Sequence, residues 1–202
     1  MYSPPYNQVE NRAEVVAFMR ANNFPILVTG TGGNLMASHL PVLVSERGDR
    51  IHIDMHMAKN NPQWKEFFDD EVRVIFHGPH AYISPRWYAE AERVPTWNYA
   101  AVHAYGVPRI VEDKKLKEQS QRRLVEAMDP QWLPRHDALG RKYVDMMLEG
   151  IVNFEIAVTR IETRWKLSQN RGRDEMERIA AALDESGERA LAALTRKHLP
   201  GD

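Results

Sequence analysis

The strongest constraint on the fold is an alternation of apolar and polar side chains with a period of two residues. In residues 151–161, apolar side chains at Val152, Phe154, Ile156 and Val158 alternate with Asn153, Glu155, Ala157 and Thr159. Successive side chains of a β-strand point to opposite faces, so this pattern predicts a strand with one buried face. Further strands are predicted at residues 26–29, 35–46, 50–56, 71–78 and 98–112.

Helices are predicted between these strands, but without the regular strand and helix alternation of a parallel sheet. The predicted helices cover residues 11–22, 62–70, 114–128, 143–150, 174–184 and 188–198. We therefore predict a mainly β, α+β fold, an antiparallel split β-barrel of about six strands with peripheral and C-terminal helices. We expect one domain over residues 1–202, with a C-terminal helical extension at about 172–202.

The composition excludes several classes of site. The chain has 202 residues and no cysteine, which excludes disulfides, thiolate metal sites, iron–sulfur clusters and cysteine nucleophiles. Its net charge of -1 gives no broad positive footprint for nucleic acid, and no apolar stretch approaches the length of a membrane span. From these features we expect a cytoplasmic protein.

Polar side chains in the strand at residues 50–56 raise the question of a metal site. His52, Asp54 and His56 share one face, but a solvated polar face explains these residue types equally well. Ser38 and Ser84 lack the GxSxG context of an activated serine, and GTGGN at 30–34 is typical of a hairpin turn. The sequence therefore predicts neither a metal ligand nor a catalytic residue.

Two features favour a phosphorylated planar ligand. Lys59 precedes a predicted helix start at Asn61 and Pro62, where a cation and free backbone N–H groups suit a phosphate. The segment VPTWNYAAVHAYG at 94–106 places on one strand face the side chains of Trp97, Tyr99, Ala101, His103 and Tyr105. That aromatic face either covers the sheet or supports a flat ring.

Five segments carry a family resemblance. They read HLP at 39–41, HMAKNNPQW at 56–64, GPHAYISPRWY at 78–88, VPTWNYAAVHAYG at 94–106 and WKLSQNR at 165–171. In this order they resemble the signature segments of PaiB-type proteins, which are FMN-binding negative transcriptional regulators. The resemblance implies a pyridoxamine-phosphate-oxidase-like split barrel that forms a homodimer with FMN in the subunit interface.

The resemblance also implies which residues contact FMN. They are His39, Leu40, Pro41, His56, Lys59, Asn61, His80, Tyr82, Thr96, Trp97, Asn98 and Trp165, supplied by either subunit. Lys59 matches the phosphate-binding lysine of the wider group, whereas Ala58 stands where that group has arginine. LSQNR at 167–171 replaces the Arg-Leu-His motif that holds substrate in pyridoxamine-phosphate oxidases, so oxidation of that vitamer is not expected.

Three functions are open at the level of sequence. The resemblance implies a transcriptional regulator that acts through its flavin or through a partner. The alternative is an FMN-dependent oxidoreductase, a flavin reductase or oxidase of unknown substrate, and a third reading is a haem-binding barrel with a histidine ligand. DNA is a partner that the sequence leaves open without supporting, because the C-terminal helices carry an apolar pattern suited to packing.

Overall fold

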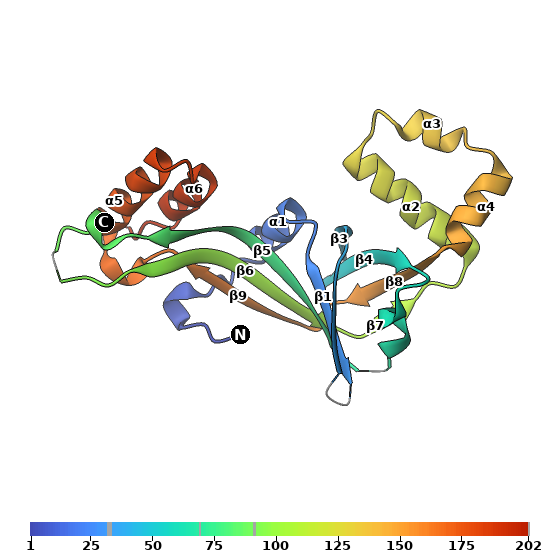
Figure 1. The fold of residues 1–202 in the computed structure, drawn as a ribbon, viewed down its shortest axis with the longest axis horizontal. Coiled ribbons are helices and arrows are strands. Elements are labelled where there is room, and N and C mark those ends of the chain that lie inside the picture. Colours follow the sequence, from blue (N-terminus) through green and yellow to red (C-terminus); the bar gives the residue numbers. More distant parts are fainter. Residues whose placement is uncertain (32–33, 69, 91, 202) are drawn as a thin grey trace. The chain divides into compact units, whose positions relative to one another are not determined.

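The computed structural model describes residues 1–31, 34–68, 70–90 and 92–201, except for the side chains at 31 and 34 (Figure 1). The strands are β1 (Ile26–Thr31), β2 (Asn34–His39), β3 (Val42–Arg47), β4 (Arg50–Ala58), β5 (Val72–Ile83), β6 (Thr96–Gly106), β7 (Pro108–Ile110), β8 (Ile151–Ala157) and β9 (Arg160–Lys166). The predicted turn GTGGN includes residues 32–33, which lie outside the described residues.

The longer helices are α1 (Arg12–Ala21), α2 (Lys114–Met128), α3 (Leu133–Asp137), α4 (Arg141–Glu149), α5 (Arg173–Glu185) and α6 (Arg189–Lys197). Short 3-10 helices are η1 (Pro5–Asn7), η2 (Pro62–Glu66), η3 (Pro85–Trp87) and η4 (Gln169–Arg171). None of the helices within the described residues is long and apolar enough to cross a membrane.

Two antiparallel sheets form the β part of the fold, which confirms the predicted α+β class. One sheet has the strand order β2-β1-β5-β6-β9, and the other has the order β3-β4-β8-β7. The register in the second sheet pairs Ile53 with Ile156 and Met55 with Phe154, so their side chains share its buried face. The polar side chains of β4 and β8 consequently lie on the opposite face.

The described residues contain nine strands rather than about six, because three predicted strands are each divided in two. The divisions fall at Leu40 and Pro41, at Val107, and at Val158 and Thr159. At each of them the chain leaves one sheet and enters the other. Pro41 and Pro108 lack the N–H that a continuing ladder needs, which explains two of these positions.

Contacts divide the chain into two compact units. The first comprises residues 1–18, 77–103 and 162–202, and the second comprises residues 19–76 and 104–161. In the first unit, α5 and α6 bury Met176, Ile179 and Leu191, and Lys197 of α6 binds Glu14 of α1 at 2.6 Å. A fully buried side chain of this size contributes about 1.5–3 kcal/mol. The expectation of a single domain stays a prediction.

Local capping explains where two of the helices begin. The backbone N–H of Glu14 donates to Asn11 Oδ1 at 3.1 Å, and that of Leu116 donates to Asp113 Oδ1 at 2.8 Å, as the capping patterns predicted. The helix expected at 62–70 begins at Pro62 with Asn61 as its cap, but it is the 3-10 helix η2 and ends at Glu66 rather than at 70. No helix was predicted between residues 128 and 143, and α3 lies there; it is too short for an apolar period to reveal.

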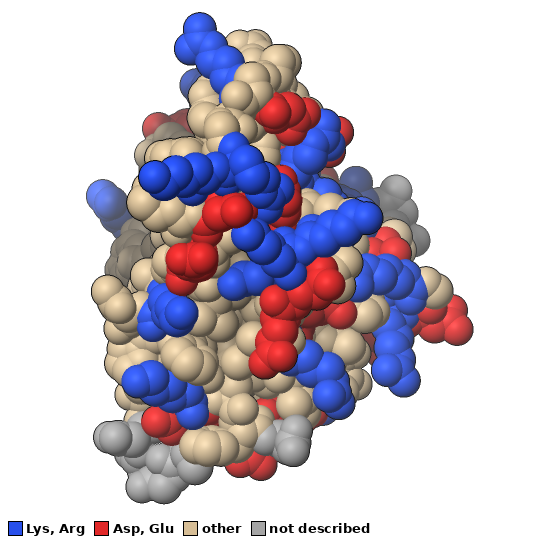
Figure 2. Space-filling view, turned by 90° about the vertical axis from the view of Figure 1, so that its right-hand side faces the viewer, with Lys and Arg blue, Asp and Glu red and all other residues tan. Residues whose placement is uncertain are grey.

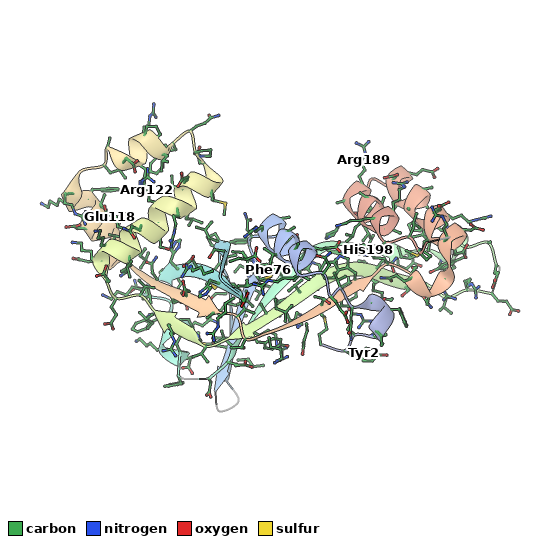
Figure 3. All side chains as sticks on the ribbon, turned by 180° about the vertical axis from the view of Figure 1, so that it is seen from behind. Tyr2, Phe76, Glu118, Arg122, Arg189 and His198 are labelled. Atoms are coloured by element: carbon green, nitrogen blue, oxygen red, sulfur yellow. The ribbon has the colours of Figure 1, made fainter. Side chains whose placement is uncertain are left out.

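Ion pairs, more than apolar burial, connect α2, α3 and α4. Arg122 of α2 binds Asp137 at 2.8 Å, and Arg141 of α4 binds Glu118 at 2.8 Å; Figure 3 labels Glu118 and Arg122 one turn apart on α2. Of these helices' described residues, Leu148 alone is buried. Figure 2 shows Lys and Arg interleaved with Asp and Glu on one face of the molecule, without a broad positive patch there.

We predict that Gly106→Ala destabilises the protein. A Cβ at Gly106 would lie 2.5 Å from the carbonyl oxygen of Ala157 and 2.7 Å from Ile156 Cγ2. Because backbone cannot yield like a flexible side chain, we expect the free energy of unfolding in urea to fall by about 1–3 kcal/mol. Gly201→Ala is the control, since nothing lies within 4 Å of an added Cβ, and equal stability of both variants would contradict the prediction.

Candidate functional site

The predicted residues Lys59 and Asn61 lie in a tightly bonded turn of the second unit. Asn61 Nδ2 donates to Ser38 Oγ at 2.9 Å, which connects the turn to β2, and Asn61 Oδ1 accepts from the backbone N–H of Gln63 at 3.0 Å. The N–H of Gln63 is therefore not free for a phosphate, contrary to our expectation. A five-residue 3-10 helix also offers no extended dipole.

Gln63, which the sequence did not single out, anchors this turn. Its side chain is fully buried, and its Nε2 lies 3.1 Å from the carbonyl oxygen of Leu27 and 3.2 Å from that of Met36. Trp64 Nε1 donates to the carbonyl oxygen of Lys59 at 3.0 Å. These bonds fix the backbone at Lys59 and leave its ammonium exposed at the surface.

A second cation lies near Lys59. Lys117 Nζ on α2 donates to the carbonyl oxygens of Leu148 at 3.1 Å and Ile151 at 3.2 Å. Burial, and then the neighbouring charge of Lys59, lower the pKa of Lys117. The sequence missed Lys117 because it is far from Lys59 along the chain. Two neighbouring lysines make this corner suitable for an anion.

The other predicted residues of the second unit lie at strand ends and on an outer strand face. His39 ends β2 with its ring 6.0 Å from that of Phe24, Leu40 is buried, and Pro41 follows at the crossing to β3. His56 lies on β4, on the same face as His52 and Asp54. Burial lowers the pKa of His56, so its imidazole is neutral near pH 7.

An exposed aromatic shelf lies on β5 and β6 of the first unit. Trp97 is 49% exposed and Tyr82 is 48% exposed, and their rings meet edge to face at 6.3 Å. Trp97 Nε1 donates to His80 Nδ1 at 3.2 Å, with the two rings stacked at 5.8 Å. His77, not among the predicted residues, contacts His80 with ring centroids 4.8 Å apart.

Two predicted contact residues are buried in the first unit and do not join this shelf. Asn98 is 0% exposed and its Nδ2 donates to Ser168 Oγ at 3.0 Å. Trp165 is also 0% exposed and packs on Phe18 with ring centroids 4.7 Å apart. Their burial assigns them to the core of this unit.

Thr96 begins β6 and is tied to β9. Lys166 Nζ donates to Thr96 Oγ1 and, at 2.9 Å, to the carbonyl oxygen of Trp97. Burial, followed by the charge of Arg164, lowers the pKa of Lys166. The sequence did not single out Lys166, which holds the start of β6 and with it the ring of Trp97.

The alternation predicted for β6 holds at the start of the strand but not along all of it. Asn98, Ala100, Val102, Ala104 and Gly106 are all buried, as predicted for one face. On the other face Trp97 is exposed and Tyr99 and His103 are half-buried, but Ala101 and Tyr105 are buried too. The small residues therefore pack, and the aromatic start of the strand is accessible to a ligand.

The family of the chain follows from sequence comparison. Residues 1–160 match the family described as "Putative FMN-binding domain". The chain belongs to this FMN-binding family. It is 42% identical over 173 residues to "Protease synthase and sporulation protein PAI 2" of Bacillus subtilis, covering 85% of this chain and 83% of that protein. The predicted PaiB-type membership is therefore confirmed, and FMN is the cofactor.

The chain is also similar to more distant relatives and to solved structures. The chain is 30% identical over 168 residues to the uncharacterized protein AN0679 of Emericella nidulans, covering 65% of this chain and 66% of that protein. It is similar to the flavocytochrome Anf3 of Azotobacter vinelandii, with a TM-score of 0.61 and 14% identity over 79% of this chain and 69% of that chain. A FAD and heme binding protein of Mycobacterium smegmatis gives a TM-score of 0.61 at 13% identity, over 79% and 73% of the two chains. These structural likenesses show the shared fold.

The described residues fit FMN in two respects. The exposed shelf of Trp97 and Tyr82 offers a flat apolar surface to a ring system, and His80 beside it adds polar ring nitrogens. The lysine corner of Lys59 and Lys117 offers positive charge to a phosphate. No group of three or more acidic or histidine side chains that could hold a metal ion occurs within the part of the chain that the structure describes.

We predict that His56 makes folding stability depend on pH. Its lowered pKa means that the unfolded chain takes up a proton first, below about pH 6.5, so stability falls as pH drops through that range. His56→Gln removes this pH dependence. As the pH falls from about 7 to 5, the free energy of unfolding of the variant should therefore decrease less than that of the wild type. An NMR titration that finds the His56 imidazole protonating at or above pH 6.5 would contradict the prediction.

Proposed function

We propose that this member of the FMN-binding family is a PaiB-like negative transcriptional regulator that acts through its flavin or through a partner protein. The observation that carries the flavin assignment is the exposed, hydrogen-bonded aromatic shelf of Trp97, Tyr82 and His80 within a matching family sequence. Trp97 and Tyr82 contact each other and each is about half exposed, so together they offer a flat ring one continuous aromatic surface.

In this proposal the isoalloxazine ring of FMN lies against the shelf of the first unit. The lysine corner of the second unit is proposed separately as a binding place for an FMN phosphate, whether of this chain's flavin or of a second chain's. The bond from Lys166 to Trp97 fixes the backbone at the start of the shelf before a ligand arrives. Lys59 supplies the mobile charge, while Lys117, held by two carbonyl oxygens, supplies a fixed one. The bound flavin supplies hydride or electron transfer, and the protein orients it.

Regulation through a flavin or a partner suits the chain better than direct reading of DNA. The C-terminal helices α5 and α6 bury their apolar faces against each other, including Leu183 and Leu191, as a packed pair does. The net charge of -1 also offers no broad positive footprint to phosphates. The relative in Bacillus subtilis is named "Protease synthase and sporulation protein PAI 2", and the PaiB-type membership that it supports is the ground for proposing a regulatory role here.

An FMN-dependent oxidoreductase is the second candidate, and one observation favours it. Because His80 Nδ1 accepts a bond from Trp97, a neutral His80 carries its proton on Nε2. Its Nε2–H can then donate a hydrogen bond to the edge of a bound flavin or to a substrate, which would orient either for the flavin's chemistry. Steady oxidation of NADH or NADPH by the purified FMN-bound protein would favour the enzyme, and an absorption spectrum separates flavin from haem.

We predict that Lys59→Glu lowers FMN affinity by at least about tenfold while the fold persists. The FMN phosphate carries about -1.5 to -2 charges, so the change removes an attraction and adds a repulsion. A charged contact of this kind is worth about 1.5–3 kcal/mol. The measurement is a titration of apo protein with FMN, and Lys65→Glu, an exposed lysine in the same turn, is the charge-matched control.

Unchanged FMN affinity in a folded Lys59→Glu variant would remove the phosphate from the lysine corner. Equal losses in Lys59→Glu and Lys65→Glu would show only a general effect of net charge. The proposal therefore requires that FMN affinity falls in Lys59→Glu and stays close to that of the wild type in Lys65→Glu.

We further predict a homodimer. A flavin on an exposed shelf needs a second surface over its ring, and a two-fold pair of identical chains is the commonest way to supply one. The ring and the phosphate of one FMN need not be held by the same chain. Light scattering at micromolar concentration should give a molar mass of twice the 23.3 kDa of one chain. The mass of a monomer at that concentration would contradict the prediction.

A further inference from the structure

An apolar cavity lies among the helices α2, α3 and α4 of the second unit, where α3 and α4 pack beside α2 (Figure 1). Its volume is about 310 Å³, which is within the range of cavities that hold small molecules. Aliphatic and methionine side chains form much of its wall, namely those of Val125, Leu139, Val144, Met147, Leu148 and Ile151. The cavity is therefore suited to an apolar occupant.

Several large side chains of this wall are exposed to solvent. Trp132 is 38% exposed, Tyr143 is 49% exposed and Met147 is 46% exposed. Leu148 alone is buried among the described residues of the three helices. The helices therefore surround a space that their own apolar side chains do not fill. A molecule that covers these side chains gains hydrophobic free energy that the helices do not obtain from one another.

Ion pairs between the helices keep this space open. Arg141 of α4 binds Glu118 of α2 at 2.8 Å, and Arg122 of α2 binds Asp137 of α3 at 2.8 Å. Exposed pairs of this kind add little stability each. They nevertheless set the spacing of the helices, because the helices cannot move together to close the cavity while these contacts are kept. The cavity is thus formed before any ligand arrives.

The charges of the lining favour an uncharged occupant. Within the described part of the chain no Lys or Arg lines the cavity, so an anion finds no partner there. The acidic residue of the lining, Glu118, already accepts from Arg141 through both carboxylate oxygens, at 3.0 and 2.8 Å. His136 Nδ1 lies 3.3 Å from Asp137 Oδ1. An ion against the apolar wall would lose its hydration without gaining a free partner, which is unfavourable.

The aromatic side chains and the volume narrow the class of ligand further. Trp132 and Tyr143 offer rings to an aromatic molecule, and Trp132 already meets the His136 ring edge to face at 5.6 Å. Met147 is flexible, and its sulfur favours aromatic contacts. The volume equals that of about ten water molecules at ~30 Å³ each, which is room for two fused rings. An α-helix of a partner protein, about 10 Å across, would not fit.

We propose that this cavity binds one uncharged aromatic molecule of about two fused rings. The rings contact Trp132, Tyr143 and Met147, and a polar substituent lies toward solvent at the open side. The site is separate from the flavin, because no residue predicted to contact FMN lines it.

The test is calorimetric titration of FMN-saturated protein with 2-naphthol and with 2-naphthoate. These probes share one ring system, but only the second is an anion near pH 7. We expect 2-naphthol to bind saturably, one molecule per chain, with a Kd below about 1 mM and without displacing FMN. The carboxylate should bind at least about tenfold more weakly, because it brings a charge to a wall without a cation.

Two neighbouring methionines of α4 provide a matched pair of variants. Met147 lines the cavity, whereas Met146 is 55% exposed and lies outside it. Met147→Glu should weaken 2-naphthol binding at least about tenfold, and Met146→Glu, with the same change of charge, should bind it as the wild type does. Val144→Phe fills part of the cavity with an apolar ring and should also weaken binding, so the test stays decisive if Met147→Glu does not fold.

Four outcomes would overturn the proposal. The first is no saturable binding of 2-naphthol up to millimolar concentration, and the second is displacement of FMN by 2-naphthol, which would place the probe on the aromatic shelf. The third is undiminished binding to folded Met147→Glu or Val144→Phe. The fourth is a lower molar mass for Met147→Glu than for Met146→Glu in light scattering, which would make this face a contact between two copies of the chain.

Discussion

Burial of one face of the four-stranded sheet is the constraint on which the rest of the second unit depends. Ile53, Met55, Phe154 and Ile156 are fully or nearly fully buried on this face. Because side chains alternate, fixing these residues inside places Asp54, His56 and Asn153 on the opposite face. The same register brings Lys59 to the end of β4, where its backbone N–H donates to the carbonyl oxygen of Gly150 at 2.9 Å.

The helices over the polar face are held differently. Exposed ion pairs such as Arg122–Asp137 and Arg141–Glu118 are screened by solvent and contribute little each, so α2, α3 and α4 lack the apolar core that α5 and α6 share. Regions with few buried apolar contacts open at lower free energy than the core does. Lys117 is part of α2, so the position of its ammonium depends on the packing of that helix.

Much of the fold was accessible from the sequence, because its signals are local. The two-residue period predicted the faces of β6 and β8, and Asn11 and Asp113 marked the starts of α1 and α2. The crossings between sheets were harder to predict. Residues 35–46 keep an apolar pattern through Leu40 and Pro41, so the pattern alone does not reveal that β2 and β3 belong to different sheets.

The candidate site depends in part on long-range contacts, which local sequence patterns do not reveal. By itself, the sequence determined the aromatic face at Trp97, the cation at Lys59 and the family, since residue type, period and motif order are properties of the chain. Only the tertiary structure decided that Asn61 is engaged with Ser38, that Lys117 neighbours Lys59, and that Asn98 and Trp165 are buried. These facts depend on contacts between residues far apart in sequence, and burial and hydrogen-bond partners are set by such contacts.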